Sequence, residues 1–311
     1  MSEMSYLDKL LDGVEVEWLP LGEVSALRRG RVMSKGYLTE NFGPYPVYSS
    51  QTANNGKIGS INTFDFDGEY ISWTTDGANA GTVFYRTGKF SITNVCGLIT
   101  LKSKYPLIYK FLFYWLTIEA KKHVYSGMGN PKLMSHQVEN IPVPIPCPDN
   151  PEKSLAIQSE IVRILDKFTA LTAELTAELT AELTMRKNQY NYYRDQLLSF
   201  KEGEVEWKTL GEVAVIGTGN HDTQDAIEHG KYIFYARGRE PLKLNVFDFD
   251  ETAIITAGDG AGVGKVFHYA KGKYALHQRA YRIVPNAFMN PRFVYHYITA
   301  YFFTYIQKAS G

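Results

Sequence analysis

The chain has 311 residues, of which 44% are hydrophobic and 14% aromatic, and its formal net charge is zero. These values allow two buried cores in domains of roughly 120 residues or more, so we expect a soluble globular protein. No apolar run reaches the roughly 18 residues of a membrane span, and the polar start Met1–Ser5 lacks a secretory signal. Cys96 and Cys147 are too few for a disulfide framework and suit the cytoplasm, where we expect the protein to be located.

Charge is distributed unevenly along the chain. Residues 1–24 carry 1 basic and 6 acidic side chains, whereas residues 25–150 carry 13 Lys and Arg against 8 Asp and Glu. Residues 151–203 carry 7 against 8, and residues 204–311 carry 12 against 11. A basic region is the electrostatic footprint of phosphate contact, but an excess of five is modest. Charge alone therefore permits nucleic-acid binding without requiring it.

The first elements in chain order are a helix end in residues 1–13 and a domain dominated by short strands. Runs rich in β-branched and aromatic residues predict three of these strands, at 70–73, 81–85 and 96–101. Apolar residues at helical spacing predict a helix at 105–125, with a counterpart at 291–307. The proline-rich segment 141–148 cannot be helical and is predicted to be an extended hinge.

The central helix, predicted at 155–200 with Ser154 as its cap, contains a perfect tetrapeptide repeat. Leu-Thr-Ala-Glu occurs three times in residues 171–182 and Leu-Thr follows, so that one apolar residue recurs every four positions. With the apolar residues before it, this stripe predicts an antiparallel coiled-coil seam. The alternative is a long helix that merely packs in a core. The stripe consists of Leu171, Leu175, Leu179 and Leu183.

Segments on the two sides of this helix resemble each other. Glu15–Val24 recurs at 204–213, Phe64–Asp67 recurs at 247–250, and the Asp76-Gly77 turn recurs at 259–260. Three motifs in one order at nearly one offset indicate two homologous domains joined by a helical spacer. The expected segments are 1–13, 14–150, 151–203 and 204–311. Because Gly311 falls where Gly127 falls in the first copy, we expect the second copy to be truncated.

Together these motifs resemble the specificity subunit of type I restriction–modification systems, and the tetrapeptide resembles that of the type IC subclass. The resemblance covers Tyr6 to Gly311 and also rests on Ser126–Met134 and on the proline-rich segment. It implies an α+β fold with two target-recognition domains, each reading half of a split DNA sequence. It also implies a central helix that sets the gap and docks two methyltransferase subunits, in a complex with restriction subunits and without a cofactor or catalytic site of its own.

Physical geometry supports the spacer independently. Four helical residues add about 6 Å and a net rotation of about 40°. One B-DNA base pair turns by about 34–36°. One tetrapeptide could therefore shift the spacing between half-sites by about one base pair while each domain still faces its groove.

Three enzyme-like motifs are weak. Gly258–Lys265 resembles a phosphate loop, but Asp259 stands where glycine is needed and Val266 replaces the magnesium-binding hydroxyl, so a strand-connecting turn is favoured. Glu119-Ala-Lys121 resembles a nuclease motif without its preceding Pro-Asp, on a helix face predicted to be exposed. Asn130-Pro131-Lys132 lacks the second proline of an adenine methyltransferase. Seven histidines in no metal-ligand spacing predict no metal site.

Basic and amide side chains in the predicted loops are candidates for DNA contact, because arginine suits guanine, amides suit adenine and lysine suits phosphate. An ordinary solvated loop is an equal alternative for each of them. The candidates are Arg28, Arg29, Arg31, Lys35, Asn54, Asn55, Lys57 and Lys132 in the first domain and Asn220, His221, Arg237, Arg239, Lys243, Gln278 and Arg279 in the second. A different class of function also stays open, a non-catalytic adaptor whose two domains bind proteins rather than DNA.

Overall fold

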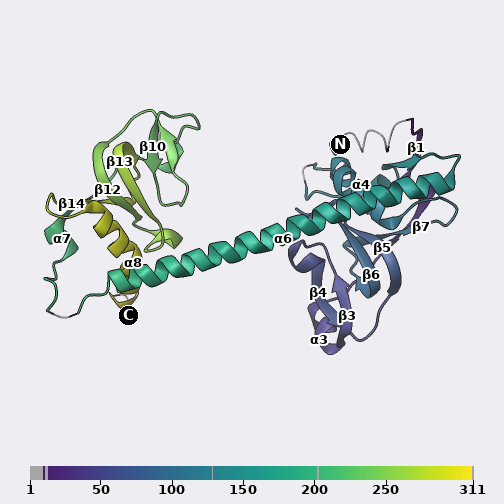
Figure 1. Cartoon of the computed structure of the whole chain (residues 1–311), viewed down its shortest axis with the longest axis horizontal. Helices are drawn as coiled ribbons and strands as arrows, with labels where there is room; N and C mark the ends of the chain where they lie inside the picture. Colours follow the sequence, from purple (N-terminus) through teal and green to yellow (C-terminus); the bar gives the residue numbers. More distant parts are fainter. Residues whose placement is uncertain (1–9, 11–12, 128, 202, 310–311) are drawn as a thin grey trace. The chain divides into compact units, whose positions relative to one another are not determined.

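The computed structural model describes residues 10, 13–127, 129–201 and 203–309. The chain divides into two compact units, Met1–Ala177 and Glu178–Gly311, and one long helix crosses the division. Figure 1 shows the elements in chain order. The helix end predicted for residues 1–13 lies almost entirely outside the described residues.

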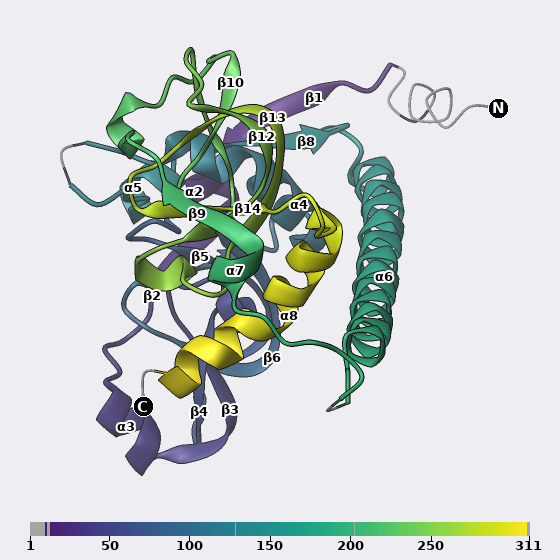
Figure 2. The ribbon, with the colours of Figure 1, turned by 90° about the vertical axis from the view of Figure 1, so that its left-hand side faces the viewer.

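The first unit is built on a six-stranded sheet in the order β2-β7-β5-β6-β3-β4. Strands β3 and β6 are parallel, and the other described neighbours are antiparallel. A second sheet pairs β1 with β8, which lie side by side in Figure 2. The strands are β1 (Val16–Pro20), β2 (Ser25–Arg29), β3 (Phe42–Tyr48), β4 (Lys57–Ile61), β5 (Phe66–Thr74), β6 (Val83–Ile92), β7 (Cys96–Leu101) and β8 (Pro142–Pro146).

Helix α4 covers one face of this sheet and closes the main core. Its Leu112 and Leu116 are buried against strands β5 and β6 together with Trp73. The Trp73 indole donates a hydrogen bond to the carbonyl of Leu133 at 2.9 Å and lies on Gly97, where a Cβ would come 2.0 Å from the ring. The helices and 3₁₀ turns are α2 (Leu21–Val24), α3 (Lys35–Glu40), η1 (Ala53–Gly56), α4 (Tyr109–Glu119), η2 (Ala120–His123) and α5 (Ser135–Val138). The predicted helix at 105–125 is therefore right in type and too long.

The second unit repeats the sheet of the first. Its order β11-β10-β13-β12-β14-β9 matches the first sheet strand for strand, and β10 and β13 form the equivalent parallel pair. Helix α8 packs on β12 and β14 as the counterpart of α4. The predicted duplication is confirmed. The elements are α7 (Leu210–Val213), β9 (Ala214–Thr218), η3 (Thr223–Asp225), β10 (Tyr232–Tyr235), β11 (Leu242–Leu244), β12 (Phe249–Ala257), η4 (Gly260–Gly262), β13 (Phe267–Leu276), β14 (Ala280–Pro285) and α8 (Pro291–Ala309).

The repeated Glu-Val-Glu-Trp motif differs in structure between the units. In the first unit it forms β1 against the proline-rich strand β8, whose Val143 and Ile145 are buried. The predicted hinge at 141–148 is wrong, because this extended segment is part of a sheet. Proline is tolerated there since β8 is an edge strand. In the second unit, residues 204–209 form no strand.

Helix α6 (Pro151–Leu197) has 47 residues and is about 70 Å long. Asn150 caps it by accepting a hydrogen bond from the Lys153 amide at 3.0 Å, so the predicted cap at Ser154 is wrong. Ser154 is instead buried inside the helix and accepts a hydrogen bond from Gln158 at 3.1 Å.

The apolar stripe of α6 changes character along its length. Ile157 is 5% exposed in the core of the first unit, whereas the repeat leucines are 47–69% exposed. The repeat therefore does not pack in a core. The antiparallel coiled coil stays a prediction, because the described part of the chain supplies no partner for these leucines.

Candidate nucleic-acid interface

Four loops of the second unit meet at one surface, called here the second loop end. They follow strands β9, β10, β12 and β13, and backbone hydrogen bonds fix them together. The His277 amide donates to the carbonyl of Tyr235 at 3.0 Å, and the Gln278 amide donates to that of His221 at 2.9 Å. The Gly258 amide donates to the carbonyl of Arg279 at 2.9 Å. Residues separated by tens of positions in the sequence are thereby brought to one surface.

Two predicted arginines meet at a carboxylate that was not predicted. Arg237 contacts Asp259 at 2.8 Å and Arg279 contacts the other oxygen of Asp259 at 3.2 Å. The hydrogen bond from Arg237 is the main cause that holds the pKa of Asp259 below its usual range, so the carboxylate is charged at neutral pH. Arg239 and Lys243 are exposed on the following loop and strand.

A histidine cluster occupies the neighbouring part of the second loop end. His221 contacts Asp248 at 3.1 Å, and Gln278 donates to Asp222 at 3.2 Å. His277 is 1% exposed, and burial lowers its pKa. Its Nδ1 accepts a hydrogen bond from the Arg279 amide at 2.9 Å. Asn220 is exposed beside this cluster.

The first unit has an equivalent loop end, held by equivalent backbone hydrogen bonds. The Thr93 amide donates to the carbonyl of Tyr48 at 2.9 Å, and the Thr75 amide donates to that of Val95 at 3.1 Å. Arg29 donates to the carbonyl of Asn94 at 2.7 Å in the same turn. Lys132 reaches this first loop end through a bridge to Asp76 and remains exposed.

The other candidate DNA contacts of the first unit differ in whether their side chains are already bound to neighbouring residues. Arg31 contacts Asp65 at 3.1 Å, and its hydrogen bond to Tyr37 is the main cause that raises the pKa of its guanidinium. Arg28 and Lys35 are exposed. The remaining candidates are in or next to η1: Asn54, Asn55 and Lys57.

Asn54 and Asn55 have the left-handed φ values of 50° and 52°, which asparagine tolerates better than most residues. Arg86 holds this turn by donating to the carbonyl of Asn55 at 2.8 Å. The Arg86 guanidinium is buried, which lowers its pKa to about 10, and it lies over the ring of Tyr48 at 3.6 Å. Sequence reasoning missed Arg86, because a strand arginine carries no signal that it turns inward.

The repeated Phe-Asp-Phe-Asp motif has a shared structural role. Arg31 and His221 form equivalent parallel bridges to Thr93 and His277. Each of these basic residues is bound by the first aspartate of the motif, Asp65 or Asp248. The repeat itself could have identified these two aspartates.

The enzyme-like motifs all occupy ordinary structural positions. Residues 258–266 connect β12 to β13 as a turn, which confirms the strand-connecting interpretation. Glu119 is 13% exposed and contacts Lys122 and His123, so its predicted exposure is wrong. Among the described residues, no group of three His, Cys, Asp or Glu side chains is placed to hold a metal ion. No described helix is long and apolar enough to cross a membrane.

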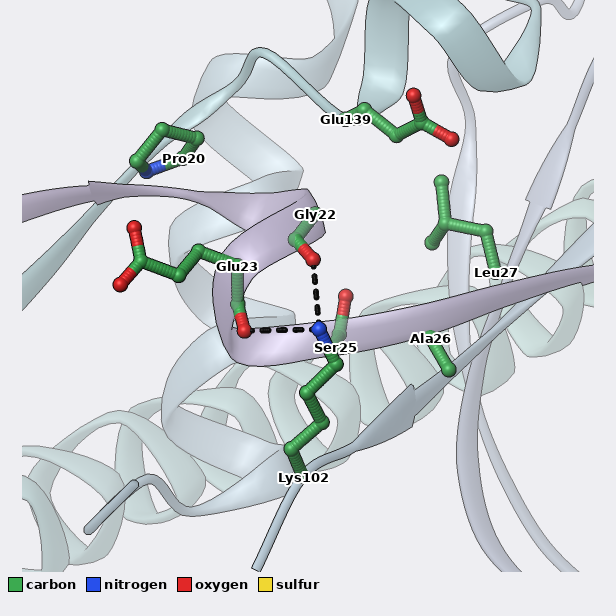
Figure 3. A pocket seen from close by; sticks show the side chains of 8 residues that line it. All are labelled: Pro20, Gly22, Glu23, Ser25, Ala26, Leu27, Lys102 and Glu139. Carbon is green, nitrogen blue, oxygen red and sulfur yellow. Dashed lines mark hydrogen bonds between the residues drawn. The ribbon is translucent and has the colours of Figure 1, made fainter. Parts of the chain in front are cut away.

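A pocket of about 400 Å³ lies against α2 and β2 of the first unit. Its lysine, Lys102, donates to the carbonyls of Gly22 and Glu23 at 2.9 and 3.0 Å, as Figure 3 shows. That lysine is therefore engaged in holding the α2 turn. The other lining residues are Pro20, Ser25, Ala26, Leu27 and Glu139.

The chain thus consists of two domains with the same strand order, each with a polar loop end, and one long helix between them in sequence. The family model for the type I restriction modification DNA specificity domain matches residues 13–185 and 202–310, and the chain belongs to this family.

Individual relatives agree with this assignment. The chain is 44% identical over 290 residues to the specificity subunit of the type I restriction enzyme EcoR124I/EcoR124II of Escherichia coli, and the match covers 86% of this chain and 64% of that protein. It is 40% identical over 327 residues to the EcoprrI specificity subunit of Escherichia coli, with 96% and 80% covered. The fold is shared with the crystal structure of a type I restriction–modification S subunit from M. genitalium, at a TM-score of 0.55, 16% identity and coverage of 96% and 80%.

Proposed function

We propose that this chain is the DNA-specificity subunit of a type I restriction–modification complex and that it recognises a split duplex sequence. In this proposal, the first loop end binds one half-site and the second loop end binds the other. The two recognition domains are assigned to residues 14–150 and 204–311. The candidate side chains at and around the two loop ends supply the base and phosphate contacts.

One observation carries the proposal, namely that the two sheets share their strand order while their loop ends carry different side chains. The strand order is the same in both units, so we attribute it to the requirements of the fold. Side chains that differ at equivalent positions suit the reading of two different half-sites, because base identity is read by hydrogen-bonding side chains.

Helix α6 is proposed to set the distance between the half-sites, with the tetrapeptide as its unit of length, as in the type IC subclass. The exposed repeat leucines are available to an antiparallel helix and to the two methyltransferase subunits. Restriction subunits would join that assembly. In this proposal the chain binds no cofactor and catalyses no step itself.

Fluorescence anisotropy with labelled duplex DNA tests the proposal. The full chain is titrated into a random duplex pool, with and without methyltransferase subunits, at two salt concentrations. Salt-dependent binding that becomes sequence-selective with the methyltransferase is expected, since phosphate contacts release counterions. Assembly with the methyltransferase without any DNA binding would reject the proposal and favour the protein-interaction adaptor.

A further inference from the structure

The second loop end contains two arginines bound to one aspartate, an arrangement that the equivalent positions of the first loop end lack. Arg237 follows β10, Asp259 follows β12, and Arg279 lies between β13 and β14, so three separate loops contribute one residue each. The two guanidiniums bind different oxygens of the one carboxylate, at 2.8 and 3.2 Å. The three side chains are 39%, 40% and 61% exposed for Arg237, Asp259 and Arg279.

The exposure of this group argues against a role in stability. Solvent-exposed ion pairs typically contribute 0 to about 1 kcal/mol to folding. Backbone hydrogen bonds already hold the three loops, including the one from Gly258 to Arg279 at 2.9 Å. What the shared carboxylate does provide is a fixed orientation for two side chains that otherwise have many rotamers, which reduces the entropy lost on binding a ligand.

Backbone register identifies the residue equivalent to Arg237. Tyr235 pairs in parallel with Leu276, and Tyr48 pairs in parallel with Ile92 at the same place in the first sheet. Arg237 lies two residues after Tyr235, and the position two residues after Tyr48 is Ser50.

The equivalent of Arg279 follows in the same way. The Gly258 amide donates to Arg279, and the Thr75 amide donates to Val95. In both units the residue after the donating amide is an aspartate, Asp76 in the first and Asp259 in the second. In the first unit, however, Asp76 accepts a hydrogen bond from the Thr75 hydroxyl at 2.5 Å and has a serine and a valine at the two arginine positions.

We propose that Arg237 and Arg279, oriented by Asp259, read guanine in the second half-site and that the first half-site is read by a different chemistry. This inference rests on the proposed function. Asp259 acts as a positioning residue, and the two arginines make the base contacts.

The carboxylate favours a base over a phosphate as the ligand. A phosphate placed on these guanidiniums would lie next to the negative charge of Asp259, which lowers the net charge of the group and weakens phosphate binding. The guanine edge carries no net charge and presents the N7 and O6 acceptors that arginine binds in bidentate fashion. Each guanidinium has five N–H donors and uses one in its hydrogen bond to Asp259. The remaining donors are enough for a bidentate contact with guanine.

Selection of bound duplexes from a randomised pool, followed by sequencing, tests this inference with the full chain and its methyltransferase partner. Wild type is expected to select guanine at a position of the second half-site. Arg237→Ala and Arg279→Ala should each reduce that preference by about 5- to 150-fold, the equivalent of 1–3 kcal/mol per bidentate contact. Asp259→Asn should reduce it less, and the bases selected in the first half-site should not change.

Two controls separate the possible explanations. Arg292→Ala removes an exposed arginine of α8, which belongs to the same unit but not to the second loop end, and should leave the guanine preference intact. Replacing the selected guanine by 7-deazaguanine removes only the N7 acceptor and should weaken wild type more than the arginine variants. Thermal unfolding of each variant checks that it is folded.

The outcomes distinguish this inference from the proposed function. Sequence-specific binding in which the arginine variants lose affinity equally for all duplexes would assign them to phosphate and overturn the inference alone. A second half-site selected without guanine would do the same. Absence of any sequence-specific binding would overturn the proposed function together with it.

Discussion

At the scale of single residues, comparison of the two units distinguishes residues that have the same structural role in both from residues that differ. Asp65 and Asp248 are equivalent, and each binds the basic side chain that follows the first strand of its sheet, Arg31 or His221. Arg31, a predicted DNA contact, is therefore engaged within its own domain. Its availability to DNA stays a prediction, because binding would have to compete with Asp65.

The buried indole of Trp73 provides a test of the first core. Trp73→Ala should lower the free energy of unfolding of the first unit by about 3–5 kcal/mol, because it leaves a cavity and removes the hydrogen bond to Leu133. Urea denaturation followed by circular dichroism measures the change. Trp18→Ala, at a site 53% exposed, serves as the control and should cost far less. Equal effects of the two substitutions would contradict the packing described.

At the scale of elements, α6 is fixed to the first unit by polar contacts with α4. Lys110 contacts Asp166 at 2.6 Å, and the Tyr114 hydroxyl donates to Asp166 at 2.6 Å. The hydrogen bond from Lys110 is the main cause that lowers the pKa of Asp166. Further along the chain, the Tyr190 hydroxyl lies 3.1 Å from His296 of α8. Each end of the helix therefore has its own anchor.

The Asp166 anchor predicts a pH dependence of stability. The pKa of Asp166 is lower in the folded than in the unfolded protein. Its contribution to the free energy of unfolding is therefore complete above the ordinary aspartate pKa of about 3.9 and is lost as pH falls through the folded pKa. Asp166→Asn should therefore destabilise the protein at pH 7 by about 1 kcal/mol or less, since both partners are 37–39% exposed. The difference from wild type in urea denaturation should vanish at acidic pH. Glu182→Gln, at the more exposed pair with Arg186, is the control; a difference that grew on acidification would contradict the assignment.

The tetrapeptide repeat predicts a change in half-site spacing. Deleting residues 175–178 shortens α6 by about 6 Å and turns the second domain by about 40°. The recognised half-sites should stay the same while the spacer between them becomes about one base pair shorter. Methylation protection on duplexes with graded spacers measures this, and replacing the same four residues by alanine, which keeps the helix length, is the control. Altered half-site bases at an unchanged spacing would rule out the spacer role.

At the scale of the whole molecule, two domains with one frame predict independent readout. Replacing Arg28 and Lys35 by alanine should weaken binding through the first half-site, and replacing Arg239 and Lys243 should act through the second. Because the two sets lie in different units, their free-energy changes should add when combined. Competition binding against duplexes altered in one half-site at a time is the measurement. Loss of discrimination at both half-sites from either set would refute the assignment of one domain to one half-site.

Sequence alone determined the repeated domains, the central helix and their order. Duplicated motifs and a fixed tetrapeptide period are local patterns, and helical periodicity needs no distant partner to be recognised. The same reasoning failed at the helix cap, where Asn150 rather than Ser154 fulfils that role, and at the proline-rich segment, whose partner β1 is more than 120 residues away in sequence.

Only the tertiary structure decided which loop residues meet. The shared carboxylate of Asp259, the inward turn of Arg86 and the pairing of Asp65 with Arg31 all join residues from different strands or loops. Such contacts depend on which strands and loops meet across long sequence separations, and short-range sequence patterns do not specify those pairings. The sequence therefore named the arginines as candidates, and the pairing of strands showed that Arg237 and Arg279 lie on one carboxylate.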